Sequence, residues 1–548
     1  MSRKWFKYLV IGFLTLFISS SYLTPFISDP WSNYSKQCFM FIAVIIGFTL
    51  FIKTTIKLNC FALLFLLIST IPLIQYSFGI LYYFEDVVLV SFYLLSFCLV
   101  YILGAHSTQI FSQQALYYYL CWGFLSLSCL SACIAIMQWS GYEALWIRVF
   151  NGDRPYANFG QPNHMATFHC MGLVGLLCLY LQKKIHVGLF LLLSILLIST
   201  LVLSQSRTVW ISYFALILFS FIYIKSLGTK TLMSLIYFAV VYVVVSVGIQ
   251  YLDHQVASTV LDRGVNSPTR IEMWKHMLYA IEQSPWWGYG WYQTQFAQLQ
   301  GVFLYINEGY LTSAHNIVLD LILWNGIPLG LAISLLFLVL LYQILKQRTN
   351  NESLFIFMLI IPILCHAQLE YPLFYAYFLL AFAFILGALS SSFKTCLELN
   401  IQAVQLIYLL LLVFSTYIYK DITEAHYRLR AASSLAGSGA ISQSSITLMT
   451  KLQTQTEFMQ LKSSMPLTEK QWVEYENYIE RMPTYYNLFK FAQILAFHNQ
   501  QDRANEVLMQ MNALYNKKHQ YSELFEDVDQ RGKMTIEHLK TIKNSEIQ

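Results

Sequence analysis

Two arginines of this 548-residue chain stand where an arginine side chain can bind an anion. Arg207 lies between two apolar runs with almost no loop around it, and an arginine in such a place usually has an anionic partner or reaches lipid headgroups. Arg270 follows Ser267-Pro268-Thr269, which predicts a helix with serine as N-cap and proline at the first helical position. A phosphate at that helix start would meet free backbone N–H groups and the guanidinium. Alternatively, Arg207 could be an arginine that extends to pair with lipid headgroups, and Arg270 a surface arginine of an interfacial helix.

His315 lies in Thr312-Ser313-Ala314-His315-Asn316, where a long polar segment enters an apolar run. We expect Thr312 or Ser313 to cap the helix that begins here, which would place His315 in its first turn. The positive end of a helix disfavours an imidazolium. A neutral imidazole at a membrane surface is suited to act as a general base. A capping or interfacial histidine is the alternative interpretation.

A second set of polar residues stands at the ends of other apolar runs. Arg154 and the segment Gln161-Pro162-Asn163-His164 offer groups that could bind a sugar or phosphate, although they could equally form turns. Glu370 follows His366 by four residues, so we expect the two to share one helix face, with Tyr371-Pro372 directly after. This pair could assist catalysis or simply satisfy its own hydrogen bonds.

Membrane-spanning helices must position these residues, because the composition excludes a soluble globule. Hydrophobic residues make up 57% of the chain and charged residues 11%, with a mean hydropathy of +0.52; soluble domains average about 25% charged residues. The unbroken apolar runs exclude a transmembrane β-barrel, whose strands alternate apolar and polar residues. The net charge of +5 is small and spread out, so no nucleic-acid partner is expected. The predicted fold class is therefore all-α, a polytopic membrane protein.

About thirteen apolar segments are long enough to be transmembrane helices. Their approximate limits are 8–24, 37–52, 58–74, 87–103, 115–137, 164–181, 187–203, 208–224, 231–249, 316–345, 353–369, 373–392 and 401–419. The basic residues on short connections favour a cytoplasmic N-terminus. Thirteen spans then place the loops 138–163 and 250–315, together with the C-terminal tail, on the outer side, which is the periplasm in a Gram-negative bacterium.

The C-terminal end has a different composition, since residues 421–548 contain 14 basic and 15 acidic residues. We therefore predict a transmembrane body, residues 1–420, and a helical soluble domain, residues 421–548. The segment from Tyr485 to Tyr515 has the pattern of two helices broken near residues 498–502, similar to one tetratricopeptide unit. At least three such units are normally needed for a free-standing solenoid. The domain is therefore expected to pack on something, most simply the loop that holds Arg270 and His315.

All ten cysteines lie in the predicted transmembrane body, nearly all within apolar runs. The sequence therefore indicates neither a disulfide framework nor a zinc site. A phosphate-binding Gly-x-x-x-x-Gly-Lys loop is absent from the sequence. Asp527-Val528-Asp529 resembles the metal-binding triplet of nucleotide-sugar transferases, but we interpret it as a solvated acidic face. No cofactor and no metal is expected.

Taken together, the polar segments resemble the O-antigen ligase and polymerase superfamily, and within it the bacterial protein O-oligosaccharyltransferases of the PglL type. The matching segments, in the family's order, are residues 154–164, 204–208, 270–274, 314–316 and 366–377. The resemblance implies a metal-independent glycosyltransferase of the inner membrane. Its donor would be an oligosaccharide linked to undecaprenyl diphosphate, and its acceptor a serine or threonine of a periplasmic protein, for example a type IV pilin-like one.

The same resemblance implies roles for individual residues. Arg207 and Arg270 would stabilise the departing diphosphate, and His315 would accept the proton of the acceptor hydroxyl. Six further residues would bind the donor: Arg154, Gln161, Asn163, His164, Glu370 and Tyr371.

Three other functions remain open. An O-antigen ligase would transfer the glycan to lipid A-core, and an O-antigen polymerase to a growing glycan, but both usually end soon after the last span. A transporter or lipid flippase would perform no chemistry. Transporters commonly carry charges near the middle of the membrane and show repeated halves, whereas here the ionisable residues collect on one predicted face and no repeat is evident.

Overall fold

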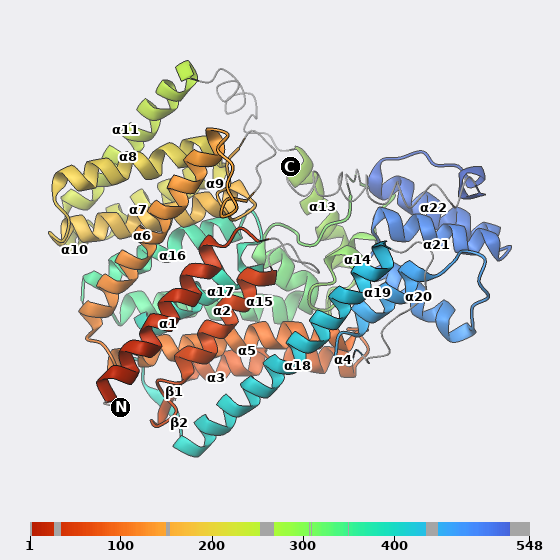
Figure 1. Ribbon diagram of the computed structural model, residues 1–548, viewed down its shortest axis with the longest axis horizontal. Coiled ribbons are helices and arrows are strands. Elements are labelled where there is room, and N and C mark those ends of the chain that lie inside the picture. Colours follow the sequence, from red (N-terminus) through yellow and green to blue (C-terminus); the bar gives the residue numbers. More distant parts are fainter. Residues whose placement is uncertain are drawn as a thin grey trace. The chain divides into compact units, whose positions relative to one another are not determined.

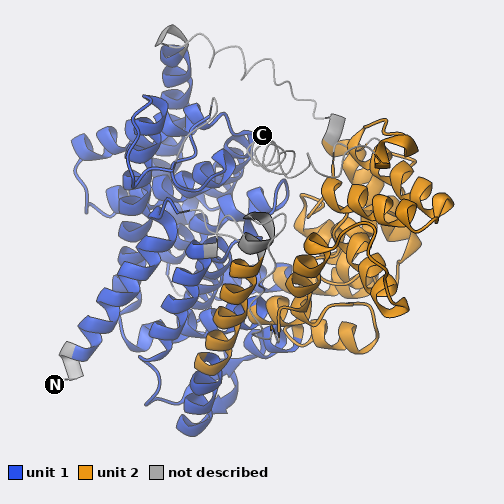
Figure 2. Cartoon of the chain, turned by 45° about the vertical axis from the view of Figure 1, so that its right-hand side comes forward, with its two compact units in different colours: residues 1–67, 93–266, 338–411 blue, residues 68–92, 267–337, 412–548 orange. Residues whose placement is uncertain are grey.

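The structure is a computed structural model that describes residues 3–26, 34–148, 154–252, 268–434 and 446–525, apart from the single residues 306, 308, 349 and 447. Contacts between residues divide the chain into two compact units (Figure 2). Unit 1 comprises residues 1–67, 93–266 and 338–411, and unit 2 comprises residues 68–92, 267–337 and 412–548. Residues 68–92 and 267–337 thus pack with the C-terminal residues. The division into a transmembrane body and a soluble domain at residue 420 stays a prediction.

The described residues are mostly helical, as predicted, with one small sheet (Figure 1). The elements up to residue 252 are α1 (Arg3–Leu23), α2 (Tyr34–Phe48), β1 (Ile56–Asn59), α3 (Cys60–Ile68), α4 (Ile71–Ser77), α5 (Phe84–His106), η1 (Ser107–Gln109), α6 (Gln113–Trp139), α7 (Pro162–Leu181), α8 (Val187–Ser204), α9 (Arg207–Ile222), α10 (Ile224–Leu227) and α11 (Thr229–Leu252).

The elements that follow are α13 (Pro268–Gln283), α14 (Thr294–Gln298), α15 (Ile317–Lys346), α16 (Glu352–Ala367), η2 (Pro372–Phe374), α17 (Ala376–Leu389), β2 (Thr395–Leu399), α18 (Ile401–Ser434), α19 (Thr450–Gln460), α20 (Glu469–Arg481), α21 (Tyr485–Phe497), α22 (Gln501–Tyr515) and η3 (Tyr521–Phe525).

Nine candidate membrane spans occur among the described residues, so the chain is a polytopic helical membrane protein. They are Phe6–Leu23, Cys60–Ser77, Phe84–Gln109, Gln113–Trp139, Pro162–Leu181, Val187–Ser204, Thr229–Ile249, Ile317–Lys346 and Ile401–Arg428. The other four segments predicted as spans form shorter apolar helices, namely Ser35–Phe48, Arg207–Ile222, Glu352–Ala367 and Ala376–Leu389. The total of thirteen therefore stays a prediction.

Small residues set the closest helix contacts of unit 1. A Cβ added to Gly104 would lie 2.2 Å from the carbonyl oxygen of Phe384, and one added to Gly387 would lie 2.0 Å from that of Tyr101, so α5 and α17 approach backbone to backbone. Gly175 of α7 approaches the Cys121 carbonyl of α6 in the same way. Because lipid provides no hydrophobic driving force between helices, such close approach and the dispersion contacts that it allows hold membrane helices together.

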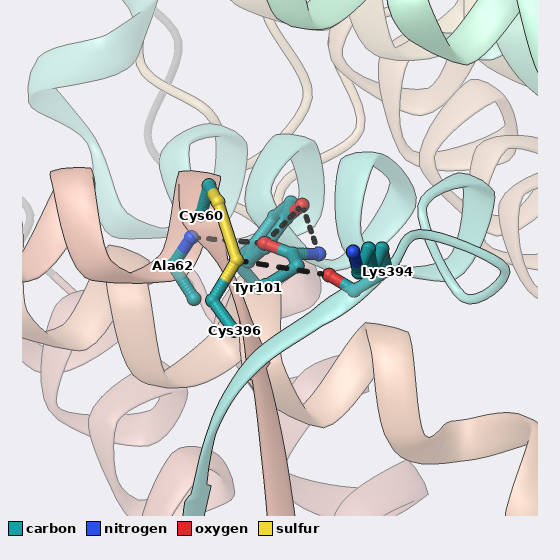
Figure 3. Close-up of a disulfide and its surroundings, with 6 residues drawn as sticks. Cys60, Ala62, Tyr101, Lys394 and Cys396 are labelled. Carbon is teal, nitrogen blue, oxygen red and sulfur yellow. Dashed lines mark hydrogen bonds between the residues drawn. A yellow bond between two sulfur atoms is a disulfide. The ribbon is translucent and has the colours of Figure 1, made fainter.

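One expectation from the sequence is wrong: unit 1 contains a disulfide between Cys60 and Cys396 (Figure 3). Strands β1 and β2 pair antiparallel and bring Cys60, which directly follows β1, beside Cys396 of β2. The two cysteines are 336 residues apart, so no local spacing could indicate the bond. Beside it, Asn59 accepts a hydrogen bond from the Ala62 backbone N–H (3.0 Å) and donates one to the Tyr101 hydroxyl (3.0 Å).

The helix that follows His315 covers nearly the residues predicted for this span, 316–345, but it is interrupted and not continuous. Gly326 interrupts α15 in a conformation with φ +76°, which only glycine adopts readily. A Cβ on Gly330 would lie 2.5 Å from the Cα of Ile322, so the two arms of α15 pack against each other. The Tyr289 N–H donates to the Leu323 carbonyl (2.9 Å), and the Ile327 N–H donates to the Pro285 carbonyl (2.7 Å). The turn after α13 thus satisfies the backbone groups that the break exposes.

The C-terminal residues of unit 2 form helices α19 to α22 around one apolar core. The predicted helical hairpin is confirmed, since α21 and α22 lie side by side and are broken at residues 498–500 (Figure 1). Buried side chains of the hairpin, such as Phe491 and Leu508, share their core with Tyr83 and Val302. Val302 belongs to the long segment between α13 and α15 that also carries His315, so the domain packs on that segment, as expected.

Polar contacts reinforce this packing within unit 2. The Lys451 ammonium lies 2.5 Å from the Asp86 carboxylate, and the Leu452 backbone N–H donates to Glu85 (2.8 Å). Burial disfavours the charge on Lys451, but Asp86 and Glu85 outweigh it and raise the pKa of this lysine above its usual value. Lys451 therefore stays charged at neutral pH. The Arg481 guanidinium lies over the Phe296 ring, 4.7 Å from its centroid.

Candidate active site

Arg207 is the first residue of α9 and its side chain is exposed. The chain reaches it through a tight turn in which Gln205 ends α8 with a left-handed backbone, φ +49°. Ser206 stands at the N-cap position, but its side chain makes no capping hydrogen bond. The N–H groups of the first helical turn have no carbonyl partner within the helix. Arg207 therefore combines a guanidinium with the start of a helix, which is the arrangement expected of an anion-binding residue.

Arg154 holds this turn in place. Its Nε donates to the Ser204 carbonyl at the end of α8 (2.7 Å), and its Nη2 donates to Asn163 Oδ1 (3.2 Å). A cation that binds the last carbonyl of a helix is favourably placed in the helix dipole. Donor binding by Arg154 stays a prediction; the structure shows that Arg154 supports the backbone three residues before Arg207.

Glu370 joins this network from the other side. Asn163 Nδ2 donates to Glu370 Oε1 and Gln161 Nε2 donates to Glu370 Oε2, each at 3.3 Å. The carboxyl group is buried, with 6% of the residue exposed. Asn163 therefore bridges the positive charge of Arg154 and the negative charge of Glu370. Four predicted site residues from distant parts of the sequence are thus in one hydrogen-bonded network.

The sequence predicted that His366 and Glu370 share one helix face. This prediction is wrong, because α16 ends at Ala367, before Glu370. Glu370 lies in the turn that follows, where its N–H bonds to the His366 carbonyl (2.9 Å). The His366 ring instead meets Thr167 Oγ1 through Nδ1 (2.8 Å). A short apolar helix with Pro362 near its end could not be distinguished from a longer one by periodicity alone.

His164 and Tyr371 lie in an aromatic cluster beside this network. His164, in the first turn of α7, is 1% exposed, and its Nδ1 lies 3.0 Å from the Tyr377 hydroxyl. The ring of Tyr375 lies 4.5 Å from the His164 ring and stacks on Tyr371 at 6.3 Å. His164 therefore supports the aromatic residues after η2, and direct contact with a donor stays a prediction for it.

Sequence reasoning missed the part that Lys36 takes in this cluster. Lys36 is 1% exposed, and its ammonium donates to the Asn158 carbonyl and lies 5.1 Å from the centroid of the Phe159 ring. Asn158 in turn donates to the Leu23 carbonyl (2.6 Å). These contacts fasten the segment before Gln161 to α1 and α2. A lysine at the very start of an apolar segment was the one signal in the sequence.

The remaining two predicted residues belong to unit 2. α13 begins at Pro268, as predicted from the sequence, although the expected cap Ser267 lies outside the described residues. Arg270 is partly exposed in its first turn. Trp274, one turn further on the same helix face, donates its Nε1–H to the Ala314 carbonyl (3.0 Å). The helix that carries Arg270 is therefore bonded directly to the residue before His315.

His315 precedes its helix instead of lying in the first turn, which corrects the prediction. α15 begins at Ile317, and Asn316 caps it by accepting from the N–H groups of Val318 (3.0 Å) and Leu319 (3.1 Å). His315 has a left-handed backbone, φ +53°, and is partly exposed. An asparagine cap and a serine cap are equally compatible with this sequence, so local preferences could not separate them.

The other histidine near these residues, His276 of α13, is poorly suited to act as a base. It is 1% exposed and its ring stacks on Tyr305 at 4.8 Å. Burial lowers the pKa of its imidazole, although hydrogen bonds with Gln298 and Asn307 act in the opposite direction. His315 is the more accessible of the two to an incoming hydroxyl.

The structure therefore gathers the predicted residues into two groups. Unit 1 holds Arg207 and the network of Arg154, Gln161, Asn163 and Glu370 with the adjacent aromatic cluster, and unit 2 holds Arg270 and His315. Among the described residues, no cluster of three or more His, Cys, Asp or Glu side chains could hold a metal ion.

Comparison with known proteins covers nearly all of these residues. A family model described as O-antigen ligase matches residues 192–334, and one described as virulence factor membrane-bound polymerase, C-terminal, matches residues 354–526. A third, described as protein glycosylation ligase, matches residues 155–181. Together these ranges include every predicted site residue except Arg154, which lies one position before the third.

Two curated proteins of Acinetobacter baylyi are similar over long stretches. A general O-oligosaccharyltransferase is 29% identical over 561 residues, which cover 97% of this chain and 96% of the relative. A ComP-specific O-oligosaccharyltransferase is 31% identical over 391 residues, which cover 68% of this chain and 70% of the relative. The chain therefore belongs to the protein O-oligosaccharyltransferases, glycosyltransferases related to the O-antigen ligases.

Proposed function

We propose that this enzyme transfers an oligosaccharide from undecaprenyl diphosphate to serine or threonine hydroxyls of proteins outside the cytoplasmic membrane, with a pilin-like protein as one acceptor. The observation that carries the proposal is the length of the similarity to the general O-oligosaccharyltransferase, which extends through the C-terminal domain. Both curated relatives are named O-oligosaccharyltransferases, and the similarity to the general one covers 97% of this chain. The long similarity therefore favours a protein acceptor.

The reaction that we propose needs no metal. The acceptor oxygen attacks the anomeric carbon, the bond between that carbon and the phosphate oxygen breaks, and lipid diphosphate leaves with the bonding electrons. His315 takes the proton of the hydroxyl as the new bond forms. Arg207 and Arg270 stabilise the charge that develops on the diphosphate, each from the start of a helix.

The remaining predicted residues would bind and orient the donor. The amides of Gln161 and Asn163 and the ring of Tyr371 are groups that sugars bind by hydrogen bonding and stacking. Arg154 and Glu370 orient those amides through the network described above. His164 supports the same region from within unit 1.

We place the enzyme in the inner membrane with thirteen spans, a cytoplasmic N-terminus, and both long loops and the C-terminal domain in the periplasm. The distribution of basic residues supports this orientation. The pairing of β1 with β2 agrees with the number of spans between them, because this arrangement assigns both connections to the same side of the membrane.

The direct test offers the purified enzyme an undecaprenyl-diphosphate-linked oligosaccharide with either a pilin-like protein or lipid A-core. We expect glycan on serine or threonine of the protein, detected by mass spectrometry, and none on lipid A-core. Transfer to lipid A-core alone would identify an O-antigen ligase and reject the proposal. Elongation of the donor glycan without an acceptor would identify a polymerase.

The C-terminal domain is proposed to dock the acceptor protein. Exchanging residues 446–525 for those of a relative should shift the ratio of kcat/KM between the two enzymes' acceptors by at least about tenfold, as about 1.4 kcal/mol of changed contacts would do. An exchange is preferable to a deletion, because a deletion would expose the buried side chains of Tyr83 and Val302 to solvent. The donor KM serves as the control and should stay the same. Unchanged acceptor preference in an active chimera would leave the domain a purely structural role.

A further inference from the structure

We propose that Asp320 is a positioning residue for the reaction, which fixes the turn that carries His315. The proposal rests on the proposed role of His315 as the base. Asp320 lies in the first turn of α15, and only 1% of the residue is exposed. A carboxylate within an apolar run is costly and usually has a specific partner. Here its partners are Thr294 and the two residues directly before His315, Ser313 and Ala314.

The carboxylate binds the turn through both of its oxygens. The Ser313 hydroxyl donates to Oδ2 (2.5 Å) and the Ala314 backbone N–H donates to Oδ1 (2.7 Å). Ser313 then accepts from the backbone N–H of His315 through its own oxygen (2.9 Å). Asp320 is therefore linked to His315 in two ways, through the side chain of Ser313 and through the peptide unit of Ala314. Of the uncharged polar side chains similar in size, none offers two acceptor oxygens.

Trp274 completes the attachment from the other direction. Its Nε1–H donates to the Ala314 carbonyl (3.0 Å), so the N–H and the C=O of Ala314 are both bonded to side chains, those of Asp320 and Trp274. Ala314 itself is fully buried. Asp320 and Trp274 together fix the peptide from which the His315 side chain projects, and the same tryptophan belongs to the helix of Arg270.

The backbone conformation of His315 explains why these hydrogen bonds are needed. A residue other than glycine in a left-handed conformation is strained and persists only where its surroundings impose it. His315 adopts φ +53°. Without the bonds to Asp320 and Ser313, the turn would relax towards more extended conformations, and the imidazole would leave the position from which it accepts the proton. A misplacement of about 1 Å can cost about a hundredfold in rate.

A double-mutant cycle between Asp320 and His315 tests the proposal in the full-length enzyme, with a lipid-linked oligosaccharide donor and an acceptor that the wild type glycosylates. Asp320→Ala should lower kcat by about 30- to 100-fold and leave the donor KM within about twofold. Asp320→Asn keeps one acceptor for the Ala314 N–H and should recover part of the loss. In a His315→Ala background, Asp320→Ala should cost less than about twofold, because Asp320 acts only through His315.

Asn325→Ala is the matched control, since Asn325 is equally buried on the same helical arm but bonds to Leu321 (3.0 Å) and Gln75 (3.3 Å), away from the turn. Its kcat should stay within about twofold even if its melting temperature falls. Near-normal kcat in Asp320→Ala, or an equal further loss in the His315→Ala background, would overturn the proposal. If the wild type uses only lipid A-core, the protein-transfer function fails, and the same cycle can be completed with that acceptor.

Discussion

Replacing His315 with alanine should lower kcat for glycan transfer by at least about a hundredfold, within the range of about 10² to 10⁴ that general base catalysis supplies. An alcohol is a weak nucleophile, so the loss of the proton acceptor should fall on the chemical step and not on donor binding. The measurement is single-turnover transfer to an acceptor protein, alongside binding of the lipid-linked donor.

His276 provides a matched control for this experiment. It lies on α13 near the same turn, but it is buried and stacked on Tyr305. A His276→Phe variant keeps the aromatic stacking and should retain kcat within about twofold. Near-normal glycosylation by the His315→Ala enzyme would remove this histidine from the mechanism and direct attention to His366 or Glu370.

The second large effect is expected at the two arginines. Arg207→Ala and Arg270→Ala should each lower kcat by at least about a hundredfold, as the loss of one donor to a developing anion commonly does. The lysine variants keep the charge but lose the planar fork that binds two phosphate oxygens at once, so they should retain intermediate activity. The measurement is kcat with saturating lipid-linked oligosaccharide.

Two controls make this result specific to an arginine-based anion site. Arg348 lies just after the C-terminal end of α15 and donates to the Leu345 carbonyl (2.8 Å). The variant Arg348→Lys should leave kcat unchanged. EDTA should not inhibit the wild type, because the arginines are proposed to supply the positive charge. A strict requirement for Mg²⁺ or Mn²⁺ would contradict the arginine mechanism.

Local sequence patterns determined most of the elements. Apolar runs identified a polytopic helical membrane protein, because spanning helices must be about 20 residues long and apolar on most faces. Pro268 marked the start of α13, and the break at residues 498–500 separated α21 from α22. Each of these features depends on neighbours in the sequence, so each could be predicted.

Polar residues at the ends of the apolar runs also indicated the candidate site. A charged side chain next to a membrane-spanning segment is costly, and it usually has a specific partner or a function. What the sequence could not show is what binds each of these residues. Arg154 bonds to Ser204, fifty positions along the chain, and Glu370 bonds to Gln161 and Asn163, more than two hundred positions away.

Tertiary structure alone decided the remaining features. The β1–β2 pairing that joins Cys60 to Cys396, the fold of α15 about Gly326, and the placement of His315 before its helix all depend on contacts between distant segments. In each case several local conformations are close in energy. The sequence of a short segment cannot choose among them, because hydrogen bonds with distant residues make the difference. Examples are the bond from the Ile327 N–H to the Pro285 carbonyl and the bond from the Trp274 Nε1–H to the Ala314 carbonyl.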